Sequence, residues 1–525
     1  MRPSFSHMPS LMALMVNSLE ISVVFFLISL LAICFFFFFI NKKTHAVFPT
    51  NWPFLGMLPA LLQMLHQIYD YSADLLESSN MTFLLKGPWF AGIDMLITVD
   101  PANIHHIMSS NFLNYTKGPE FNEVFEVFGE AIFNTDSDLW KDKRKSAQVM
   151  LNHHGFQRFT LSTTVNKIKK GLVPLLDHAA KLNVALDLQD VFQRFAFDTT
   201  FFLVSGFDAK SLSIEMPEVE LARALDDAEE AIVYRHVKPK FLWRMQNWIG
   251  FGSEKKIRRA RETFDRVCRR YISVKREEIR TGFHSEGESM DLLTSYMNLD
   301  TTKYKLLNPK EDQFLQDIIL TFMVAGTNTI ASALSWLFWI LSKNPNAVAK
   351  IREEISTKLP STGNLEHSFD PAELNKLVYL HGALCETLRL YPPVPFQRKS
   401  PIKPDILPSG HKVDAKLKII FAVYALGRAR AVWGDDASEF KPERWISDNG
   451  GLKHVPSFKF YSFGTGPRTC LGRDVAFVQM KLVAMELLQN YDFKVVEGHL
   501  VEPVVSMILQ MKHGLKVTVT KMCLA

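Results

Sequence analysis

The sequence predicts a mainly α-helical protein with small β-sheets, built as one large domain behind an N-terminal membrane anchor. Three observations support this fold class. Long apolar-rich segments of helical length recur in the C-terminal half, strand-like alternation is confined to short stretches, and residues 21–40 form an uninterrupted apolar run. With 525 residues, 47% of them hydrophobic and 22% charged, the chain can bury a large core.

The composition argues against several classes of protein. The formal net charge is only +5, whereas a nucleic-acid-binding protein usually carries a clustered basic face, so no nucleic-acid partner is indicated. The five cysteines are scattered without a CxxC pair, which argues against a zinc site or a disulfide framework and favours a reducing compartment. The 41 phenylalanines are an excess that indicates a core, or a cavity, of low polarity.

The apolar run at residues 21–40 predicts a transmembrane helix, because about 20 apolar residues span the hydrocarbon core of a bilayer. A cleaved signal peptide is the alternative, but Asn41, Lys42 and Lys43 follow the run in place of a small-residue cleavage site. The two lysines predict that the main body faces the cytosol and that residues 1–20 form a lumenal tail. Two glycosylation sequons, at Asn80 and Asn114, would be used only in the opposite orientation.

Residues 41–60 are rich in proline and predict an extended strap, whereas residues 61–525 show no linker or repeat that would divide them. Within this domain, residues 310–343 predict one helix that is apolar nearly all round and therefore runs through the core. A capping-box pattern at residues 370–373 predicts the start of another helical region. Further helices are expected over residues 377–390 and 475–489, and strands over residues 416–423 and 515–519.

The most informative segment is residues 463–472, FGTGPRTCLG, which lies directly before a predicted helix. Its glycines permit turns and a close approach to a flat ligand. Cys470 lies near a helix N-terminus, where free N–H groups favour a thiolate, and Arg468 can donate to a carboxylate. A thiolate beside an arginine and an apolar ring suits the iron and the propionates of a haem. The segment therefore predicts a haem site built from Phe463, Gly464, Arg468, Cys470 and Gly472.

At these residues the sequence resembles the cytochrome P-450 family of haem-thiolate monooxygenases, whose pattern F-x-x-G-x-R-x-C-x-G is complete here. Three further motifs of the family occur in the expected order, and the resemblance extends from the anchor to the C-terminus. It implies the cytochrome P-450 fold for residues 61–525, haem b as the cofactor, and Cys470 as the axial ligand of the iron.

One of these motifs is E-x-x-R, at Glu386 and Arg389. Residues three apart on a helix share a face, so these two side chains can pair. Residues 440–445 resemble the family's P-E-R-F segment, with Trp445 in place of phenylalanine, and the resemblance implies that Arg444 joins the pair. This triad is expected to be structural and to brace the cysteine loop.

Trp140 and Arg144 match the family's W-x-x-x-R motif. Positions four apart lie on one helix face, so both side chains could reach the same haem propionate. Arg398 and His454 are weaker candidates for this role, and an ordinary surface charge is the alternative for each.

Residues 325–330, AGTNTI, match the family's A/G-G-x-D/E-T-T/S motif within the predicted long helix. Gly326 costs about 1 kcal/mol relative to alanine in mid-helix, and together with Ala325 it is expected to leave room for dioxygen and substrate. The resemblance implies that Thr329 binds the oxygen. Asn328 departs from the pattern, because an amide cannot pass a proton as a carboxylic acid can. Water could carry protons past it, the enzyme could be slow and leak reduced oxygen, or it could rearrange an already oxidised substrate.

Electrons are expected from a partner protein, since no nucleotide- or flavin-binding signature is evident. The chain resembles the microsomal members of the family, which receive electrons from a membrane-bound NADPH–cytochrome reductase. This implies a single-pass protein of the endoplasmic reticulum membrane. The basic run of Lys141, Lys143, Arg144 and Lys145 could steer an acidic partner, and a solvated face is the alternative.

Residues 52–59 and 391–397 resemble a plant branch of the family that hydroxylates fatty acids and long-chain alkanes, including mid-chain alkane hydroxylases of cuticular wax synthesis. Several apolar residues fall where the family's substrate-recognition loop and pocket lie, and plain core packing is the alternative for each. These candidate substrate contacts are Phe112, Phe121, Phe125, Phe128, Phe133, Phe322, Ala325, Val394, Phe396, Met507 and Ile508.

The leading hypothesis is a membrane-anchored haem-thiolate monooxygenase that hydroxylates a long aliphatic chain, such as a fatty acid or an alkane, with O2 and electrons from NADPH. One alternative is a family member that rearranges hydroperoxides without oxygenation, and it would turn over without NADPH. The other alternative is a haem-binding protein without catalytic activity.

Overall fold

The computed structural model describes residues 29–30, 47–89, 92–282, 291–359 and 371–522. The predicted lumenal tail and nearly all of the predicted anchor lie outside the described residues, so the transmembrane helix stays a prediction. The last part of the predicted strap is described, and it is not extended throughout. Helix α2 (Leu58–Gln63) begins within it, with Pro59 in the first turn, where a proline is tolerated because that N–H has no helical partner.

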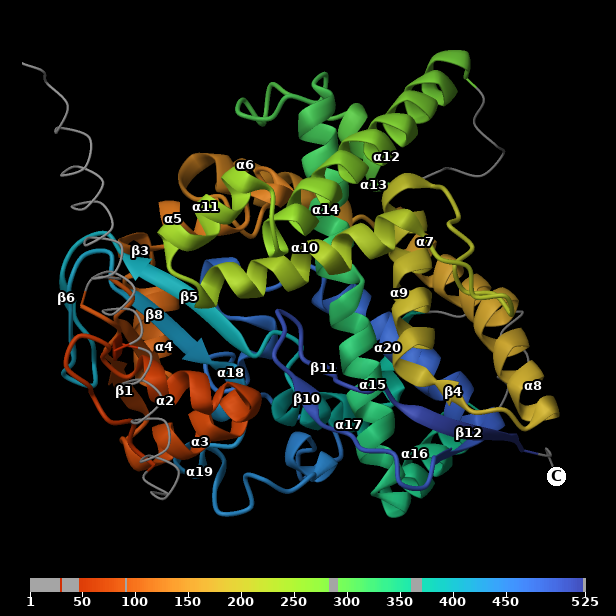
Figure 1. Ribbon diagram of the computed structural model, residues 1–525. Helices are drawn as coiled ribbons and strands as arrows, with labels where there is room; N and C mark the ends of the chain where they lie inside the picture. Colours follow the sequence, from red (N-terminus) through yellow and green to blue (C-terminus); the bar gives the residue numbers. More distant parts are fainter. Residues whose placement is uncertain (1–28, 31–46, 90–91, 283–290, 360–370, 523–525) are drawn as a thin grey trace, which may run out of the picture.

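Helices make up most of the described chain (Figure 1). The longer ones are α3 (Ile68–Ser78), α6 (Ser137–Leu151), α7 (His154–Lys167), α8 (Val173–Leu182), α9 (Leu188–Ser205), α10 (Glu220–Val237), α11 (Lys240–Ile249), α12 (Ser253–Thr281), α14 (Asp312–Gly326), α15 (Asn328–Ser342), α16 (Pro345–Lys358), α17 (Val378–Leu390) and α20 (Arg473–Asn490). Shorter ones are α4 (Pro101–His105), α5 (Pro119–Val124), α13 (Leu292–Met297), α18 (Val423–Leu426) and α19 (Arg430–Trp433).

The strands form small sheets, as the sequence predicts. The largest sheet has the order β1-β2-β8-β5-β3, in which only β2 and β8 run parallel. It lies with α2 and α3 at one side of the molecule (Figure 1). The strands are β1 (Thr82–Leu85), β2 (Met95–Thr98), β3 (Tyr115–Thr116), β4 (Leu186–Asp187), β5 (Phe396–Pro401), β6 (Asp405–Ile406), β7 (Lys412–Val413), β8 (Lys418–Ala422), β9 (Tyr491–Val495), β10 (Pro503–Val504), β11 (Gln510–Met511) and β12 (Lys516–Lys521).

The predicted long helix does run through the core, and it passes through the middle of the molecule in Figure 1. Asp312–Ser342 is the one described segment that is long and apolar enough to cross a membrane, and 78% of its most apolar stretch is buried inside the protein, as in a core helix. It is not one regular helix, however. The backbone of Thr327, with ψ −78°, departs from helical geometry and separates α14 from α15.

Four other expected elements are found and one differs. Helices α17 and α20 and strands β8 and β12 occupy the predicted positions within about three residues. The helical region after residues 370–373 is a single 3-10 segment, Pro371–Lys376, and not an α-helix. It stops because Leu377 leaves the helical region of backbone space with ψ 79°, directly before α17 begins.

Candidate active site

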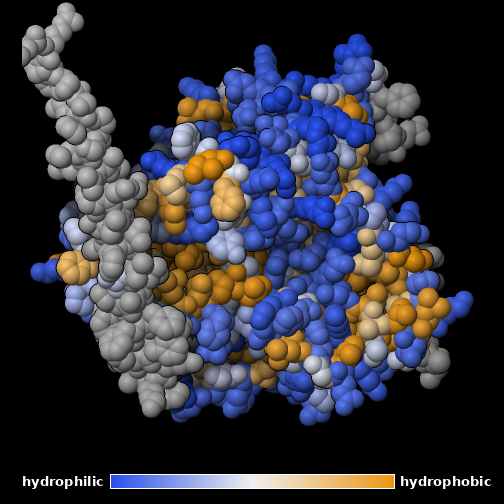
Figure 2. All heavy atoms as spheres, in the orientation of Figure 1, coloured by the Kyte–Doolittle hydropathy of each residue, from blue (hydrophilic) through white to orange (hydrophobic). Residues whose placement is uncertain are grey.

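A cavity of about 740 Å³ lies between the cysteine loop, the junction of α14 and α15, and strand β5. Its volume is in the range of small-molecule sites. On the face shown in Figure 2, apolar side chains line a hollow between α10 and the N-terminal elements α2 and α3. The residues of α2 and its following turn that line the cavity are Leu58, Leu61, Leu62 and Leu65.

The cysteine loop, residues 463–472, forms one wall of this cavity. The Cys470 N–H donates to the Phe463 carbonyl at 2.7 Å, which closes the loop before α20 begins. Gly466 has a left-handed φ of +66°, and a Cβ there would collide with the Met108 carbonyl, so the loop packs directly on a neighbouring backbone. The five predicted haem-contacting residues of the loop, Phe463, Gly464, Arg468, Cys470 and Gly472, all line the cavity.

Cys470 differs from the other two described cysteines, because its side chain is exposed to the cavity whereas Cys268 and Cys385 are buried in the core. Although this side chain is open to the cavity, the protein around it raises the pKa of the Cys470 thiol by burial, whereas the Gly472 N–H and the Arg144 guanidinium lower it. The expected thiolate therefore needs more than the helix N-terminus. A metal cation is the kind of partner that would deprotonate this thiol.

The structure brings the predicted triad together. Arg389 donates to both carboxylate oxygens of Glu386, from Nε at 2.8 Å and from Nη2 at 2.7 Å, and Arg444 Nε donates to Glu386 Oε1 at 3.3 Å. Both members of the first pair are about 1% exposed or less. Arg389 also donates to the carbonyls of Gly427, Ala437 and Glu439. The triad therefore holds the chain that precedes the cysteine loop.

The contacts of Trp445 explain why a tryptophan stands where the family's P-E-R-F segment has phenylalanine. Its indole Nε1 donates to Glu386 Oε2 at 2.9 Å, a hydrogen bond that a phenylalanine could not make. Its ring also packs on Phe460 at a centroid distance of 4.5 Å, and Ser462 donates to the Leu388 carbonyl at 2.7 Å. These contacts connect the triad to the cysteine loop.

Trp140 and Arg144 of α6 both line the cavity, on the same helix face as predicted. Arg144 Nη2 donates to the Thr469 carbonyl at 2.8 Å, which ties α6 to the cysteine loop. The guanidinium of Arg468 lies 4.4 Å from the centre of the Trp140 ring, as in a cation–π contact. Arg468 also donates to Asp136 at 2.6 Å.

Cations are in excess at this end of the cavity. Arg468 pairs with Asp136, and Arg398 pairs with Glu120 at 2.7 Å. Within the described residues, no carboxylate forms an ion pair with Lys117 or Lys399, two further cavity-lining residues. Burial and the neighbouring arginines lower the pKa of Lys117 to about 7. The Nε atoms of Arg398 and Arg468 are buried without a hydrogen-bond partner. An anion with two carboxylates fits this cluster.

Lys117 and Lys399 were not predicted from the sequence, because neither belongs to a motif. The only signal was a lysine beside Arg398 in an otherwise buried strand. His454, in contrast, is exposed and does not line the cavity, so its predicted propionate contact is wrong. It lies on a surface segment, residues 452–454, in which every residue is exposed.

The basic run on α6 is not a continuous surface patch. Lys143 is buried, donates to the Glu130 carbonyl, and lies 3.7 Å from the Glu130 carboxylate. Arg144 faces the cavity. Only Lys141, which pairs with Asp138 at 2.8 Å, and Lys145 are exposed. The helical period explains this difference, because Lys141 and Lys145 are four residues apart and share a face, whereas Lys143 and Arg144 point elsewhere.

The break between α14 and α15 borders the same cavity as the cysteine loop. Two backbone hydrogen bonds cross it, from the Thr327 N–H to Met323 at 3.1 Å and from the Ala331 N–H to Thr327 at 3.3 Å. Thr329 lines the cavity, and its hydroxyl donates to the Ala325 carbonyl at 2.6 Å. The helix thus uses a side chain to satisfy a carbonyl that the break leaves free.

Ala325 and Gly326 also line the cavity. The structure adds a second reason for the glycine. A Cβ at Gly326 would lie 2.9 Å from the side chain of Thr200 on α9, which is closer than side chains tolerate. Close packing of the two helices therefore requires a glycine at this position, besides the room that it leaves in the cavity.

Asn328 does not line the cavity, in contrast to the prediction that grouped it with Thr329. Its amide nitrogen points to α10 and donates to Glu229 at 3.0 Å and to Asp226 at 3.1 Å. Neighbouring residues on a helix point about 100° apart, so Asn328 can face α10 while Thr329 faces the cavity.

Most candidate substrate contacts do line the cavity, namely Phe121, Phe125, Phe133, Phe322, Ala325, Val394, Phe396, Met507 and Ile508. Phe128 and Phe112 do not. Phe128 is 0% exposed and packs on Phe133 and Phe264 in the core. Phe112 packs against Trp140 at a centroid distance of 5.6 Å. The sequence analysis missed His236, which lines the cavity, packs edge-on against Phe125, and has its pKa lowered to about 4 by burial.

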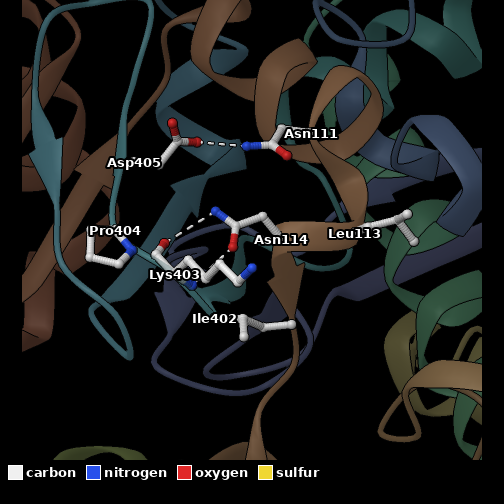
Figure 3. A pocket seen from close by; sticks show the side chains of 7 residues that line it. All are labelled: Asn111, Leu113, Asn114, Ile402, Lys403, Pro404 and Asp405. Carbon is white, nitrogen blue, oxygen red and sulfur yellow. Dashed lines mark hydrogen bonds between the residues drawn. The ribbon is translucent and has the colours of Figure 1, made fainter.

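A smaller pocket of about 400 Å³ lies elsewhere and contains one of the two sequons (Figure 3). The Asn114 side chain accepts from the Lys403 N–H at 2.9 Å and donates to the Lys403 carbonyl at 3.2 Å. Asp405 accepts from Asn111 at 2.9 Å and from Tyr115 at 2.7 Å. Because the Asn114 amide is already used within the fold, a glycan there would disrupt these contacts.

The comparisons with known proteins agree with this geometry. The chain is 55% identical to alkane hydroxylase MAH1 of Arabidopsis thaliana, over 95% of this chain and 98% of that protein. It is 41% identical to noroxomaritidine synthase 1 of Narcissus pseudonarcissus, over 90% and 91% of the two chains. It is 38% identical to cytochrome P450 86B1 of Arabidopsis thaliana, over 91% and 86%.

These relatives confirm the predicted plant alkane hydroxylase branch and favour a monooxygenase over the two alternative functions. The cytochrome P450 family description matches residues 47–519, which is nearly all of the chain. The cofactor of this family is a haem whose iron is held by a cysteine thiolate. The chain therefore belongs to the cytochrome P450 family and is a haem-dependent monooxygenase.

Proposed function

We propose that this protein hydroxylates a long alkane at a carbon within the chain. The observation that supports this substrate class most directly is the cavity, whose lining is predominantly apolar. A long aliphatic chain fits such a lining because burial of each CH2 group contributes about 0.8 kcal/mol. The relative with 55% identity is named an alkane hydroxylase, which supports the same class.

The residues at one end of the cavity fit a haem. Cys470 would ligate its iron, and the cation cluster of Lys117, Arg398, Lys399 and Arg468, with Arg144 and Trp140, would hold its two carboxylates. When bound, the haem supplies the oxidising chemistry that inserts an oxygen atom into a C–H bond. Phe463, Gly464 and Gly472 would lie against its face on the cysteine side.

On the opposite side, the residues at the helix break would manage oxygen and water. Gly326 and Ala325 leave space beside the ring, and Thr329 carries the hydroxyl that can exchange the Ala325 carbonyl for a small polar molecule. Phe121, Phe125, Phe322, Val394, Phe396 and Met507 would orient the substrate chain and exclude water. Positioning of the chain against these rings would decide which carbon is hydroxylated.

The substrate would enter from a membrane. Residues 21–40 would anchor the protein in the endoplasmic reticulum membrane with the described part in the cytosol. Around α11, which contributes to the cavity mouth, Phe241, Trp248 and Phe251 are 66%, 86% and 70% exposed. Rings this exposed are unfavourable in water and favourable in a bilayer interface. An NADPH–cytochrome reductase in the same membrane would supply the electrons.

The proposal is tested by expressing the full chain with a reductase in microsomes and supplying NADPH with mixed long-chain alkanes and fatty acids. Mass spectrometry should detect secondary alcohols of the alkanes that are absent without NADPH. The matched control is Cys470→Ser, which should form none. Hydroxylation of fatty acids alone would contradict the alkane substrate, and no oxygenated product from any aliphatic chain would contradict the substrate class.

A further inference from the structure

The side chain of Asn328 lies between two acidic residues of α10. The motif at residues 325–330 did not predict this arrangement. Asn328 Nδ2 donates to Glu229 Oε2 at 3.0 Å and to Asp226 Oδ1 at 3.1 Å. The two carboxyl groups therefore lie on either side of one amide nitrogen. Glu229 is 6% exposed, whereas Asp226 is an exposed residue.

A buried carboxyl group needs either a cation or a proton. In the part of the chain that the structure describes, no lysine, arginine or histidine forms an ion pair with Glu229 or Asp226. Nearby charged side chains form ion pairs with other residues. Lys256 of α12 pairs with Asp227 and Glu230, and Asp190 of α9 pairs with Arg194. Burial raises the pKa of Glu229 to about 8, with the hydrogen bond from Asn328 opposing this shift and the charge of Asp226 adding to it. With no cation paired to it, Glu229 is expected to hold a proton near neutral pH.

From this juxtaposition we propose that Glu229 serves as the proton-holding acid that position 328 lacks, with Asn328 positioning it beside the break in the distal helix. The Asn328 amide donates to Oε2, which leaves Oε1 to carry the proton. The family's motif has an acidic residue at the position of Asn328 on α15. Here Glu229 of the facing helix α10 would supply the carboxyl group at nearly the same place.

In this proposal the proton would reach the cavity through the helix break, because Asn328, which contacts Glu229, is the first residue of α15 after the break. Thr327 lies at the break, and its buried hydroxyl has no protein partner, which is where an ordered water usually binds. Thr329, two residues later, lines the cavity. Glu229 would give its proton to a water in the break, and the carboxylate would regain a proton from solvent through the exposed Asp226. No covalent bond to carbon forms and no electron moves in this step.

Glu229 is a positioning and proton-holding residue here, since it touches neither cavity nor cofactor. The inference rests on the monooxygenase activity, which consumes protons along with electrons. A purely structural role for the cluster, in which it only joins α10 to α15, is the alternative. Glu229→Gln separates the two, because the glutamine oxygen can still accept from Asn328 but cannot release a proton near neutral pH.

The first readout does not depend on turnover. The unfolded chain has Glu229 near its ordinary pKa of 4.5, and the folded protein holds the proton up to about pH 8. The folded state binds more protons in between, so the wild type should lose stability relative to Glu229→Gln as the pH rises from about 4.5 to 8. The measurement is the thermal unfolding midpoint of both haem-bound proteins across this range. Parallel curves would overturn the proposal.

The second readout is the coupling of electrons to product. General-acid assistance contributes roughly 10²–10⁴-fold to rates, and water replaces part of it, so Glu229→Gln should lower product per NADPH by about tenfold and raise peroxide release. Glu229→Asp should retain part of the coupling. The matched control is Glu230→Gln, an exposed neighbour paired with Lys256, which should couple as the wild type does. Coupling of Glu229→Gln within twofold of the wild type would overturn the proposal.

The third readout is whether a second substitution restores the coupling that Glu229→Gln loses. Asn328→Asp in the Glu229→Gln background restores one acid at the position where the family carries it, and it should recover most of the lost coupling. Failure of this double variant to recover, with the haem intact, would mean that the cluster acts structurally. If the wild type consumes NADPH without hydroxylating alkanes, the proposed substrate fails, whereas the stability curves and peroxide release still decide the role of Glu229.

Discussion

Glu386 provides the most demanding test of how the fold holds the cysteine loop. Its Oε1 accepts hydrogen bonds from Arg389 Nη2, the Lys441 N–H and Arg444 Nε, and its Oε2 accepts from Arg389 Nε and Trp445 Nε1. In Glu386→Gln, the amide nitrogen replaces one of these oxygens and faces at least two donors. Each hydrogen bond to a charged group contributes about 1.5–3 kcal/mol.

Two such losses amount to about 3–6 kcal/mol, which agrees with the roughly 3–5 kcal/mol for breaking a buried ion pair. We therefore expect Glu386→Gln to lower the free energy of unfolding by about 3–5 kcal/mol. Urea unfolding, followed in parallel by circular dichroism and haem absorption, measures this loss. The control is Glu439→Gln, whose carboxylate is 62% exposed and, among the described residues, pairs with Lys441 alone, and which should change stability by less than about 0.5 kcal/mol. A loss below about 1 kcal/mol in Glu386→Gln would refute the structural role.

Three further experiments test the site. Cys470→Ser should abolish the thiolate absorption band of the reduced carbonyl complex, measured by difference spectroscopy, and a retained band would contradict the ligand assignment. Gly326→Ala should cost about 1–3 kcal/mol of stability by overpacking against Thr200, and Thr200→Ala in the same chain should recover most of it in a urea titration. Phe125→Ala should shift the position of hydroxylation seen by mass spectrometry, whereas Phe128→Ala should cost about 3–5 kcal/mol of stability and leave that position unchanged.

The sequence could predict those features of the site that depend on the spacing of residues close together in the chain. The E-x-x-R pair, the W-x-x-x-R face and the closed cysteine loop all arise within a few residues of one another, so helical and turn geometry fix them. The cation cluster could not be predicted in this way. Lys117 follows β3, Lys399 lies on β5, and Arg468 lies in the cysteine loop, and only the folded chain brings them to one end of the cavity.

The direction in which individual side chains point was also beyond the sequence. Phe125 and Phe128 are three residues apart, and the short 3-10 segment Glu126–Phe128 turns the second ring into the core while the first faces the cavity. Similarly, Lys143 is buried because α6 lies against Glu130 and α14, which the run of basic residues alone could not reveal.

Asn328 shows how a departure from a motif can be consistent with the rest of the fold. An aspartate there, with Glu229 and Asp226 both about 3 Å away, would bring three carboxyl groups together, two of them buried, and raise their pKa values further. An amide donates to both acids without adding charge. The spacing of residues in the sequence already indicated that Glu229 is buried, since it lies on the apolar stripe of α10 with Leu225 and Ile232. Asn328→Asp should therefore improve coupling only where Glu229 has been replaced, and an equal gain in the wild type would show that the two positions act independently.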